Sequence, residues 1–235
     1  MGTSGIEGRY DRNFNTLSLE EQTKLSASKV AVIGLGGLGG GVCEMLARVG
    51  VGHLTLIDGD TFEASNLNRQ LLSQEHLIGV FKAQAAKDRI NAINSEVIVK
   101  HLIEYLDESN LYERIKNADL VMDCLDAIDT RFMLQKAAFK ASIPIVSGAI
   151  AGVTGQVTTI LPGDKGYELI YGKKGGKQSK GVETKTGNMA YCALFVAALQ
   201  SSECFKILLD RGDILQNKLL IAELWTNTFD IIDLV

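Results

Sequence analysis

A glycine-rich turn between an apolar strand and a helix constrains this chain more than any other feature. Lys29 to Gly34 is a short β-branched run typical of a buried parallel strand, and Gly36 to Val49 carries apolar residues at helical spacing. Residues 34–39 read GLGGLG, a G-x-G-x-x-G pattern. The first glycine permits a tight turn, the second lets backbone amides approach a phosphate, and the third lets the helix lie close to the strand. The sequence therefore predicts a site for an anionic ligand at the start of the helix.

Strands and helices alternate through the first two thirds of the chain. We predict strands at 29–34, 53–58, within 96–105, at 120–123 and at 144–148, and helices at 36–49, 82–94, 111–116 and 130–141. This spacing is typical of right-handed crossovers and a parallel sheet. After residue 148 we expect a strand at 156–161 with no helix before it, a long apolar helix at 189–209, and strands at 218–225 and 228–234. The predicted fold class is α/β, a Rossmann-like, mostly parallel sheet extended by antiparallel strands in the C-terminal third.

The composition indicates one globular domain over residues 1–235. A hydrophobic fraction of 46% excludes general disorder, and two prolines exclude a Pro-rich linker. The net charge of −4 gives no basis for binding nucleic acid or a membrane surface, and no apolar run reaches the roughly 18 residues of a membrane span. We expect a cytoplasmic protein without nucleic-acid or membrane partners.

One segment, residues 163–187, departs from the rest in composition. It carries six lysines and seven glycines. A stretch of this kind inside a compact domain is either a mobile functional loop or a disordered excursion, and the composition does not separate the two.

Charged side chains after the glycine-rich turn decide which nucleotide fits best. Asp58 ends the second strand, where a carboxylate can accept both ribose hydroxyls. A dehydrogenase would use the same half-site for NAD. Arg69 and Lys82, however, can flank the same sheet edge, and Asp126 follows the fourth strand. Transfer of a phosphoryl or nucleotidyl group from a triphosphate needs such cations and a metal ion. A carboxylate such as Asp126 can hold Mg²⁺. Hydride transfer has no use for this density of charge, so ATP with magnesium is favoured over NAD.

Several motifs together extend this interpretation. They are RYDR at 9–12, GLGGLG at 34–39, LTLIDGD at 54–60, SNLNRQ at 65–70, Lys82, MDCLDAIDTR at 122–131 and SGAIAGVTGQVTTI at 147–160. In this combination the chain resembles the ThiF/MoeB/HesA family, bacterial relatives of ubiquitin-activating enzymes, from about residue 9 to about residue 210. Within the 122–131 motif we expect Asp123 to cap the following segment and Arg131 to be a structural partner on a helix.

The resemblance implies an activity and a set of roles. The family uses ATP and Mg²⁺ to adenylate the C-terminal carboxylate of a small ubiquitin-like sulfur carrier ending in Gly-Gly, and it releases pyrophosphate. By matching motif, the resemblance implies phosphate binding by Gly34, Gly36 and Gly37, ribose binding by Asp58, contacts to the phosphates and reacting centre from Asn66, Arg69 and Lys82, magnesium at Asp126, and supporting roles for Asp60 and Gln70. It also implies a homodimer in which Arg12 reaches the ATP of the partner subunit.

The cysteines depart from the family pattern. Family members with structural zinc carry two C-x-x-C pairs, whereas Cys43, Cys124, Cys192 and Cys204 form none, so we predict no zinc. Many members also place a cysteine in a crossover loop, yet residues 181–187 contain no thiol. We therefore expect an enzyme that stops at the adenylate and leaves sulfur to another protein's persulfide or to sulfide.

Other functions stay open at this point. The chain could be a nucleotide-binding regulatory or scaffold protein that has lost catalysis, or an NAD-dependent Rossmann oxidoreductase. Adenylation of another carboxylate or of an acyl group on a tRNA base, as by a related branch of the family, is a further alternative, although no tRNA-directed basic domain is visible. The pathway, thiamine, molybdopterin or related sulfur metabolism, is not fixed by the sequence.

Overall fold

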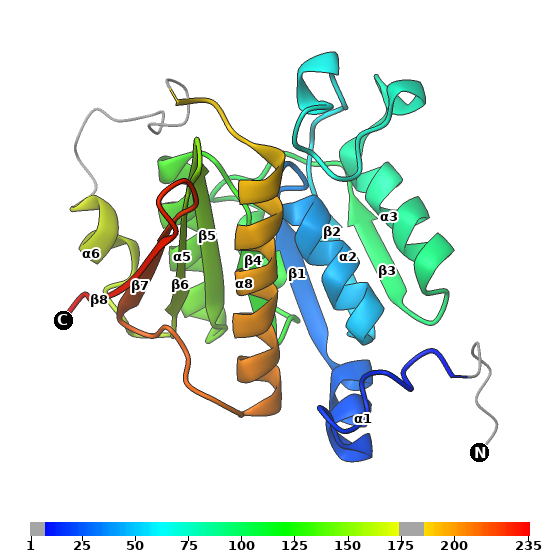
Figure 1. Cartoon of the computed structure of the whole chain (residues 1–235), viewed down its shortest axis with the longest axis horizontal. Helices are drawn as coiled ribbons and strands as arrows, with labels where there is room; N and C mark the ends of the chain where they lie inside the picture. Colours follow the sequence, from blue (N-terminus) through cyan, green and yellow to red (C-terminus); the bar gives the residue numbers. More distant parts are fainter. Residues whose placement is uncertain (1–7, 174–185) are drawn as a thin grey trace.

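A computed structural model describes residues 8–173 and 186–235 of the chain. Within them, one eight-stranded sheet has the order β3-β2-β1-β4-β5-β6-β7-β8 (Figure 1). Its strands are β1 (Lys29–Ile33), β2 (His53–Ile57), β3 (Ile98–Leu102), β4 (Leu120–Asp123), β5 (Ile145–Ala151), β6 (Thr154–Ile160), β7 (Lys218–Glu223) and β8 (Thr228–Asp233). The strands from β3 to β5 pair in parallel, and β6, β7 and β8 continue the sheet in antiparallel fashion. The predicted fold class is confirmed.

Helices cover both faces of the sheet. Figure 1 shows α2 (Gly39–Val49), α3 (Lys82–Ile93) and α8 (Ala190–Leu209) side by side in front of it. The helices α4 (Leu111–Ile115) and α5 (Ile128–Ala141) pack on the opposite face. Successive residues of a strand point to opposite faces, and accordingly Val32 belongs to the core under α2 and α8 while Ile33 belongs to the core under α4 and α5. The central strands β1 and β4 are therefore buried on both sides, as the β-branched composition of β1 predicts.

Helix α8 resembles a membrane span in composition but is a core helix. It is long and apolar enough to cross a membrane by length and composition alone. Its side chains at Cys192, Val196 and Cys204 are fully buried in the same core as α2. Packing within the domain therefore accounts for its apolar content.

A first helix, α1 (Leu19–Ala27), was not predicted. Ser18 caps it: the Ser18 hydroxyl accepts a hydrogen bond from the Glu21 backbone at 3.1 Å, and the Glu21 carboxylate accepts one from the Ser18 backbone at 2.7 Å. This S-x-x-E capping box can be recognised in the sequence. The short 3₁₀ turns η1 (Ala64–Asn66) and η2 (Glu75–Leu77) shape the long connection between β2 and α3.

The segment predicted as a loop at 163–187 begins with structure. A short helix, α6 (Tyr167–Tyr171), lies inside it, and Tyr167 is fully buried. Residues 167–171 are therefore an ordered turn of helix that Tyr167 anchors in the core. Residues 174–185 lie outside the described residues, so the prediction stays a prediction there.

Candidate active site

The glycine-rich turn connects β1 to α2 as predicted, although the helix begins at Gly39 rather than at Gly36. Gly34 has a positive φ of +86°, and a Cβ there would lie 2.8 Å from the carbonyl oxygen of Cys124. A Cβ on Gly39 would lie 1.9 Å from the carbonyl oxygen of Gly34. Both positions therefore require glycine. Among the described residues, no side chain caps the N-terminus of α2, so the helix dipole and the N–H groups of its first turn can face an anion.

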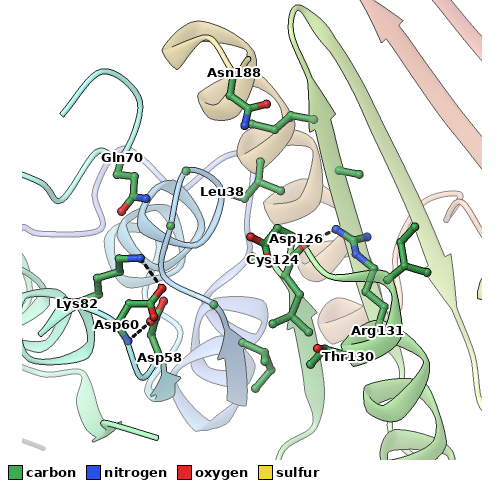
Figure 2. Close-up of a pocket in the computed structure, with 18 of the residues that line it drawn as sticks. Leu38, Asp58, Asp60, Gln70, Lys82, Cys124, Asp126, Thr130, Arg131 and Asn188 are labelled. Atoms are coloured by element: carbon green, nitrogen blue, oxygen red, sulfur yellow. Dashed lines mark hydrogen bonds and ion pairs between the residues drawn. The ribbon is translucent and has the colours of Figure 1, made fainter. Parts of the chain in front are cut away.

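A cavity of about 1190 Å³ opens at this end of the parallel strands (Figure 2). Of the predicted site residues, it is lined by Gly34, Gly36, Gly37, Asp58, Asp60, Arg69, Gln70, Lys82 and Asp126. Figure 2 shows Lys82, Asp60 and Asp58 grouped on one wall, with Asp126 across from them. The cavity exceeds the roughly 300–1,000 Å³ of ordinary small-molecule sites. It therefore has room for a nucleotide and part of a second substrate.

Asp58 is fixed by two backbone hydrogen bonds. Its Oδ2 accepts from the N–H of Leu35 at 2.7 Å, and its Oδ1 accepts from the N–H of Asp60 at 2.8 Å. Burial raises the pKa of the Asp58 carboxyl, against the lowering effect of these two bonds. Each carboxylate oxygen has further lone pairs. The geometry thus leaves Asp58 able to accept hydroxyl donors from a ligand.

Lys82 and Asp60 form an ion pair on the same wall. The buried Lys82 Nζ lies 3.0 Å from Asp60 Oδ2, and the Tyr105 hydroxyl donates to Asp60 Oδ1 at 2.9 Å. Burial alone would raise the pKa of Asp60, but the hydrogen bonds from Lys82 and Tyr105 outweigh it and hold that pKa below its usual value. Asp60 is therefore a carboxylate at neutral pH, and Lys82 brings a buried ammonium to the cavity.

Arg69 and Gln70 extend the wall next to the glycine-rich turn. Arg69 Nη1 donates to the carbonyl oxygen of Ser65 at 2.9 Å and to Asn68 Oδ1 at 2.8 Å, so the guanidinium is partly engaged by its own loop. Gln70 is 7% exposed and lies beside Gly36, and its Oε1 has no hydrogen-bond partner among the described residues. A buried acceptor without a partner is unusual in folded proteins and points to a ligand donor here.

Asp126 is exposed on the loop between β4 and α5. One carboxylate in the same cavity as the glycine-rich turn has the chemistry to hold Mg²⁺, which keeps several waters and takes one or two protein oxygens. In the described part of the chain, no group of three or more His, Cys, Asp or Glu residues could hold a metal ion. The expectation of no zinc stays a prediction.

Two predicted residues lie elsewhere. Asn66 is buried outside the cavity lining, and its Oδ1 accepts from the N–H of Glu63 at 3.1 Å, which closes the η1 turn. Arg12 also does not line the cavity. Its neighbour Asn13 donates to the carbonyl oxygen of Val49, at the end of α2 remote from the glycine-rich turn. Arg12 therefore lies far from the cavity of its own chain.

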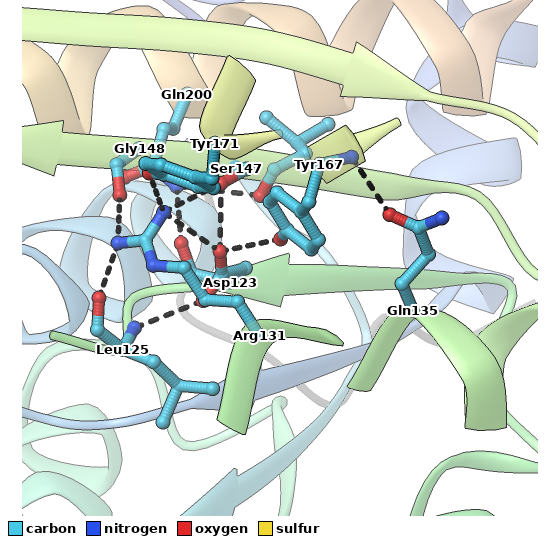
Figure 3. Close-up of polar contacts among 10 residues, drawn as sticks. Asp123, Leu125, Arg131, Gln135, Ser147, Gly148, Tyr167, Tyr171 and Gln200 are labelled. Atoms are coloured by element: carbon cyan, nitrogen blue, oxygen red, sulfur yellow. Dashed lines mark hydrogen bonds and ion pairs between the residues drawn. The ribbon is translucent and has the colours of Figure 1, made fainter. Parts of the chain in front are cut away.

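A buried polar network supports the cavity floor and was largely missed from the sequence (Figure 3). The Asp123 carboxylate, fully buried at the end of β4, lies 3.1 Å from Arg131 Nη1. It also accepts hydrogen bonds from the hydroxyls of Ser147 and Tyr167, both at 2.6 Å. The backbone N–H of Leu125 donates to its other oxygen at 3.0 Å. Asp123 thus holds the turn that follows it through Leu125, although it does not cap α5, and Arg131 is its ion-pair partner on that helix.

The network shapes the loop that carries Asp126. Arg131 Nη2 donates to the carbonyl oxygens of Leu125 and Gly148, the latter at 2.8 Å, and Arg131 itself lines the cavity. Gln200 of α8 donates to the carbonyl oxygen of Asp123 at 2.9 Å from the other side. These contacts join residues far apart in the chain, so apart from the Asp123–Arg131 spacing the sequence gives no signal for them.

The four thiols are poor nucleophiles. Burial raises the pKa of Cys43 to about 12, and it raises those of Cys124, Cys192 and Cys204 as well. Cys124 lines the cavity but is held as a protonated thiol.

Comparison with known proteins settles the family. Residues 10–234 match the ThiF family. The chain belongs to the ThiF family. It is 33% identical over 224 residues to the SAMP-activating enzyme E1 of Haloferax volcanii, covering 94% of this chain and 83% of that protein. It is 34% identical over 225 residues to the molybdopterin-synthase adenylyltransferase of Escherichia coli, covering 94% and 90%. This ThiF-family protein is accordingly an adenylyltransferase, which implies the use of ATP.

Solved structures agree on the fold. The crystal structure of E. coli MccB with ATP matches with a TM-score of 0.83 and 24% identity, covering 97% of this chain and 72% of that one. The crystal structure of PaaA matches with a TM-score of 0.80, also at 24% identity, covering 100% and 76%. At this identity the likeness concerns the arrangement of the sheet and helices.

Proposed function

We propose that this protein uses ATP and Mg²⁺ to adenylate the C-terminal glycine carboxylate of a small ubiquitin-like sulfur carrier, releasing pyrophosphate, in the cytoplasm. The carrier would serve thiamine, molybdopterin or related sulfur metabolism. The relatives named as molybdopterin-synthase adenylyltransferase and SAMP-activating enzyme support a substrate of this class.

One observation carries the proposal: a single cavity joins the glycine-rich turn, Arg69 and Lys82 to a wall made by β5 and β6. We place the phosphates of ATP at the end with the glycine-rich turn and the two cations. Beyond them the cavity runs along the turn between β5 and β6, where Ala149, Ala151 and Thr154 line it together with the larger Ile150 and Gln156. Small side chains leave space for an extended peptide without bulky side groups, as a Gly-Gly tail would be. The cavity therefore suits a nucleotide and a peptide carboxylate meeting end to end.

In the proposed reaction the protein positions the two substrates and stabilises negative charge, and it forms no covalent bond to either of them. A carboxylate oxygen of the tail forms a bond to the α-phosphorus, and the bond from that phosphorus to the bridging oxygen breaks as pyrophosphate leaves. The backbone N–H groups at the start of α2 and the cations Arg69 and Lys82 would stabilise the charge that develops on the phosphate oxygens. Magnesium held by Asp126 would neutralise the leaving pyrophosphate. Because burial raises the pKa of Cys124, the thiol that lines the cavity, we propose that sulfur comes from a separate persulfide donor or from sulfide.

The end of the sheet offers a surface for a protein partner. All six residues of β8 are exposed, and Trp225, Phe229, Ile231 and Ile232 are among the exposed large apolar side chains. An exposed edge strand with such residues is prone to unwanted pairing unless a partner covers it. This supports a protein substrate over a free small molecule.

We further propose that the protein is a homodimer in which Arg12 acts on the partner subunit's ATP. The position of Arg12, at the end of the domain remote from its own cavity, supports action in trans. A guanidinium supplied this way would add charge stabilisation at the transferring phosphate.

ATP–pyrophosphate exchange tests the proposed function. The protein is incubated with ATP, Mg²⁺, labelled pyrophosphate and a ubiquitin-like carrier ending in Gly-Gly, and label in ATP is measured. We expect exchange with this carrier and none when its last glycine is removed. Asp126→Ala should reduce the rate on the order of 100-fold or more. Asp129→Ala, an exposed aspartate outside the cavity lining, is the matched control. Exchange that is absent, or equal in the two variants, would contradict the proposal.

The alternative of an NAD-dependent oxidoreductase has a separate test. Calorimetric titration with ATP, NAD and NADP should show ATP binding that Mg²⁺ strengthens, because the cavity is lined by Arg69, Lys82 and the exposed carboxylate of Asp126. Tighter binding of NAD would favour the oxidoreductase. ATP binding without exchange would favour a regulatory or scaffold protein.

A further inference from the structure

The Asp60 carboxylate is held from two sides at the rim of the cavity. Lys82 Nζ donates to its Oδ2 at 3.0 Å, and the Tyr105 hydroxyl donates to its Oδ1 at 2.9 Å. The backbone N–H of Asp60 also donates to Asp58. A hydrogen-bonded row therefore runs along the wall from Tyr105 through Asp60 to Lys82, beside the carboxylate proposed to bind ribose.

Tyr105 is an unusual member of this row. It follows β3, outside every motif discussed above, and its side chain is 74% exposed. Its ring lies against the backbone of Gly59, where a Cβ would come within 2.9 Å of three ring atoms. The ring thus covers the turn between Asp58 and Asp60 and lines the cavity. The hydrogen bond to Asp60 raises the pKa of Tyr105, as expected when a phenol donates to a carboxylate.

A negative charge this close to a phosphate site needs to be controlled. Lys82 is buried, and its ammonium pairs with Asp60 in this structure. When phosphates bind, Lys82 turns toward them. An Asp60 carboxylate that was free to rotate would stay paired with the Lys82 ammonium, and its negative charge would then lie close to the phosphates and repel them. A donor on the second oxygen prevents that rotation.

We propose that Tyr105 is a positioning residue for ATP: by fixing the Asp60 carboxylate at the rim, it leaves the Lys82 ammonium able to turn to the phosphates. This inference rests on the proposed function, since it concerns the same nucleotide. Tyr105 does not touch ATP in this proposal; it acts on ATP through Asp60 and Lys82.

A double-mutant cycle tests it with ATP and Mg²⁺ alone, without a carrier. Calorimetry gives the Kd of MgATP for the wild type, Tyr105→Phe, Asp60→Asn and the double variant. Tyr105→Phe keeps the ring on Gly59 and should raise Kd about three- to tenfold, the scale of one hydrogen bond. In the Asp60→Asn background the same change should alter Kd by less than about twofold, because the repelling charge is gone. Tyr112→Phe, a tyrosine on α4 whose ring faces Lys140, should leave Kd unchanged.

A second readout isolates the contact itself. With ζ-¹³C tyrosine, NMR titration should place the pKa of Tyr105 above its ordinary value in the wild type, and Asp60→Asn should lower it. The proposal would be overturned if Tyr105→Phe changed the Kd of MgATP equally in the wild-type and Asp60→Asn backgrounds. It would also be overturned if Asp60→Asn left the pKa of Tyr105 unchanged. If the wild-type protein did not bind MgATP, the proposed function itself would be contradicted. Failure of the Tyr105 proposal and failure of the proposed function therefore give different results.

Discussion

At the scale of single residues, the candidate site depends on a carboxylate that is never exposed to solvent. Asp123 has an exposed fraction of 0%, and its charge is balanced by Arg131 and by the hydroxyls of Ser147 and Tyr167. A buried ion pair is costly to break from one side, because the remaining charge stays in a low-dielectric interior. Since Asp123 stands three residues before Asp126, the network also fixes the loop on which the proposed metal ligand lies.

Breaking this pair should therefore destabilise the protein strongly. Arg131→Met is expected to lower the free energy of unfolding by about 3–5 kcal/mol, measured by urea denaturation. Tyr167→Phe removes one hydrogen bond to a fully buried carboxylate and should cost about 1.5–3 kcal/mol, which keeps the test available if the first variant does not fold. A loss below about 1 kcal/mol in both variants would show that Asp123 is not a buried charge.

The cysteines give a second prediction at this scale. A variant with all four replaced by Ser or Ala should retain ATP–pyrophosphate exchange once its folding has been verified. Burial raises the pKa of each thiol, so none of the four is expected to be a thiolate nucleophile at neutral pH. Loss of exchange on replacing a single cysteine, at unchanged stability, would identify a nucleophile instead.

At the scale of elements, the glycine-rich turn and the strand ends were predictable, and the supporting contacts were not. The turn at 34–39 and Asp58 can be recognised in the sequence because these residues lie within one strand–turn–helix–strand unit. The helix α6 was missed because its anchor is a contact from Tyr167 to Asp123, 44 residues apart in sequence. Tyr105 was missed for the same reason, since its partner Asp60 lies on another connection. Local patterns predict elements, whereas such pairings depend on how the sheet brings connections together.

The contact between α2 and α3 allows a prediction on pH. The Glu44 carboxylate accepts from Arg89 Nε at 2.9 Å and Nη2 at 2.8 Å, and also from Arg48. The hydrogen bond from Arg89, aided by that from Arg48, lowers the pKa of Glu44 against the effect of burial. The folded pKa is depressed, so this stabilisation is present above the unfolded pKa of about 4.3 and is lost as pH falls through the folded value.

Glu44→Gln should accordingly reduce the free energy of unfolding at pH 7 by about 1–2 kcal/mol. The difference from the wild type should shrink as pH falls below about 4.3. Urea unfolding at several pH values measures both. Glu113→Gln, which removes an exposed pair with Lys116, should leave the unfolding free energy nearly unchanged. A difference for Glu44→Gln that does not vary with pH would show that the ion pair is not its cause.

At the scale of the whole molecule, the proposed active site draws on two subunits. The cavity lies at one end of the domain and Arg12 at the other, so under this proposal Arg12 acts on the ATP of a second copy of the chain, in addition to Arg69 of the same chain. A two-fold dimer would place the two arms and the two cavities in matching positions. Arg12→Ala and Asp126→Ala should then each reduce adenylation without unfolding the protein.

Mixing the two variants tests this arrangement. In a mixed dimer, one cavity has both its own Asp126 and the partner's Arg12, while the other cavity carries both changes. Random subunit exchange makes half of the dimers mixed, so roughly a quarter of wild-type activity should return. Recovery near zero, with exchange verified independently, would mean that Arg12 acts within its own chain or not at all.

The central claim is that a carboxylate attacks the α-phosphorus of ATP in this cavity. The most direct measurement uses a Gly-Gly carrier whose C-terminal carboxylate is labelled with ¹⁸O. The protein, the carrier and MgATP are incubated, the product is cleaved with hydroxylamine, which attacks the carbonyl carbon, and the released AMP is analysed by mass spectrometry. The account predicts one ¹⁸O atom in each AMP, because the bridging oxygen of the adenylate comes from the carboxylate. Label in inorganic phosphate, or unlabelled AMP, would contradict it.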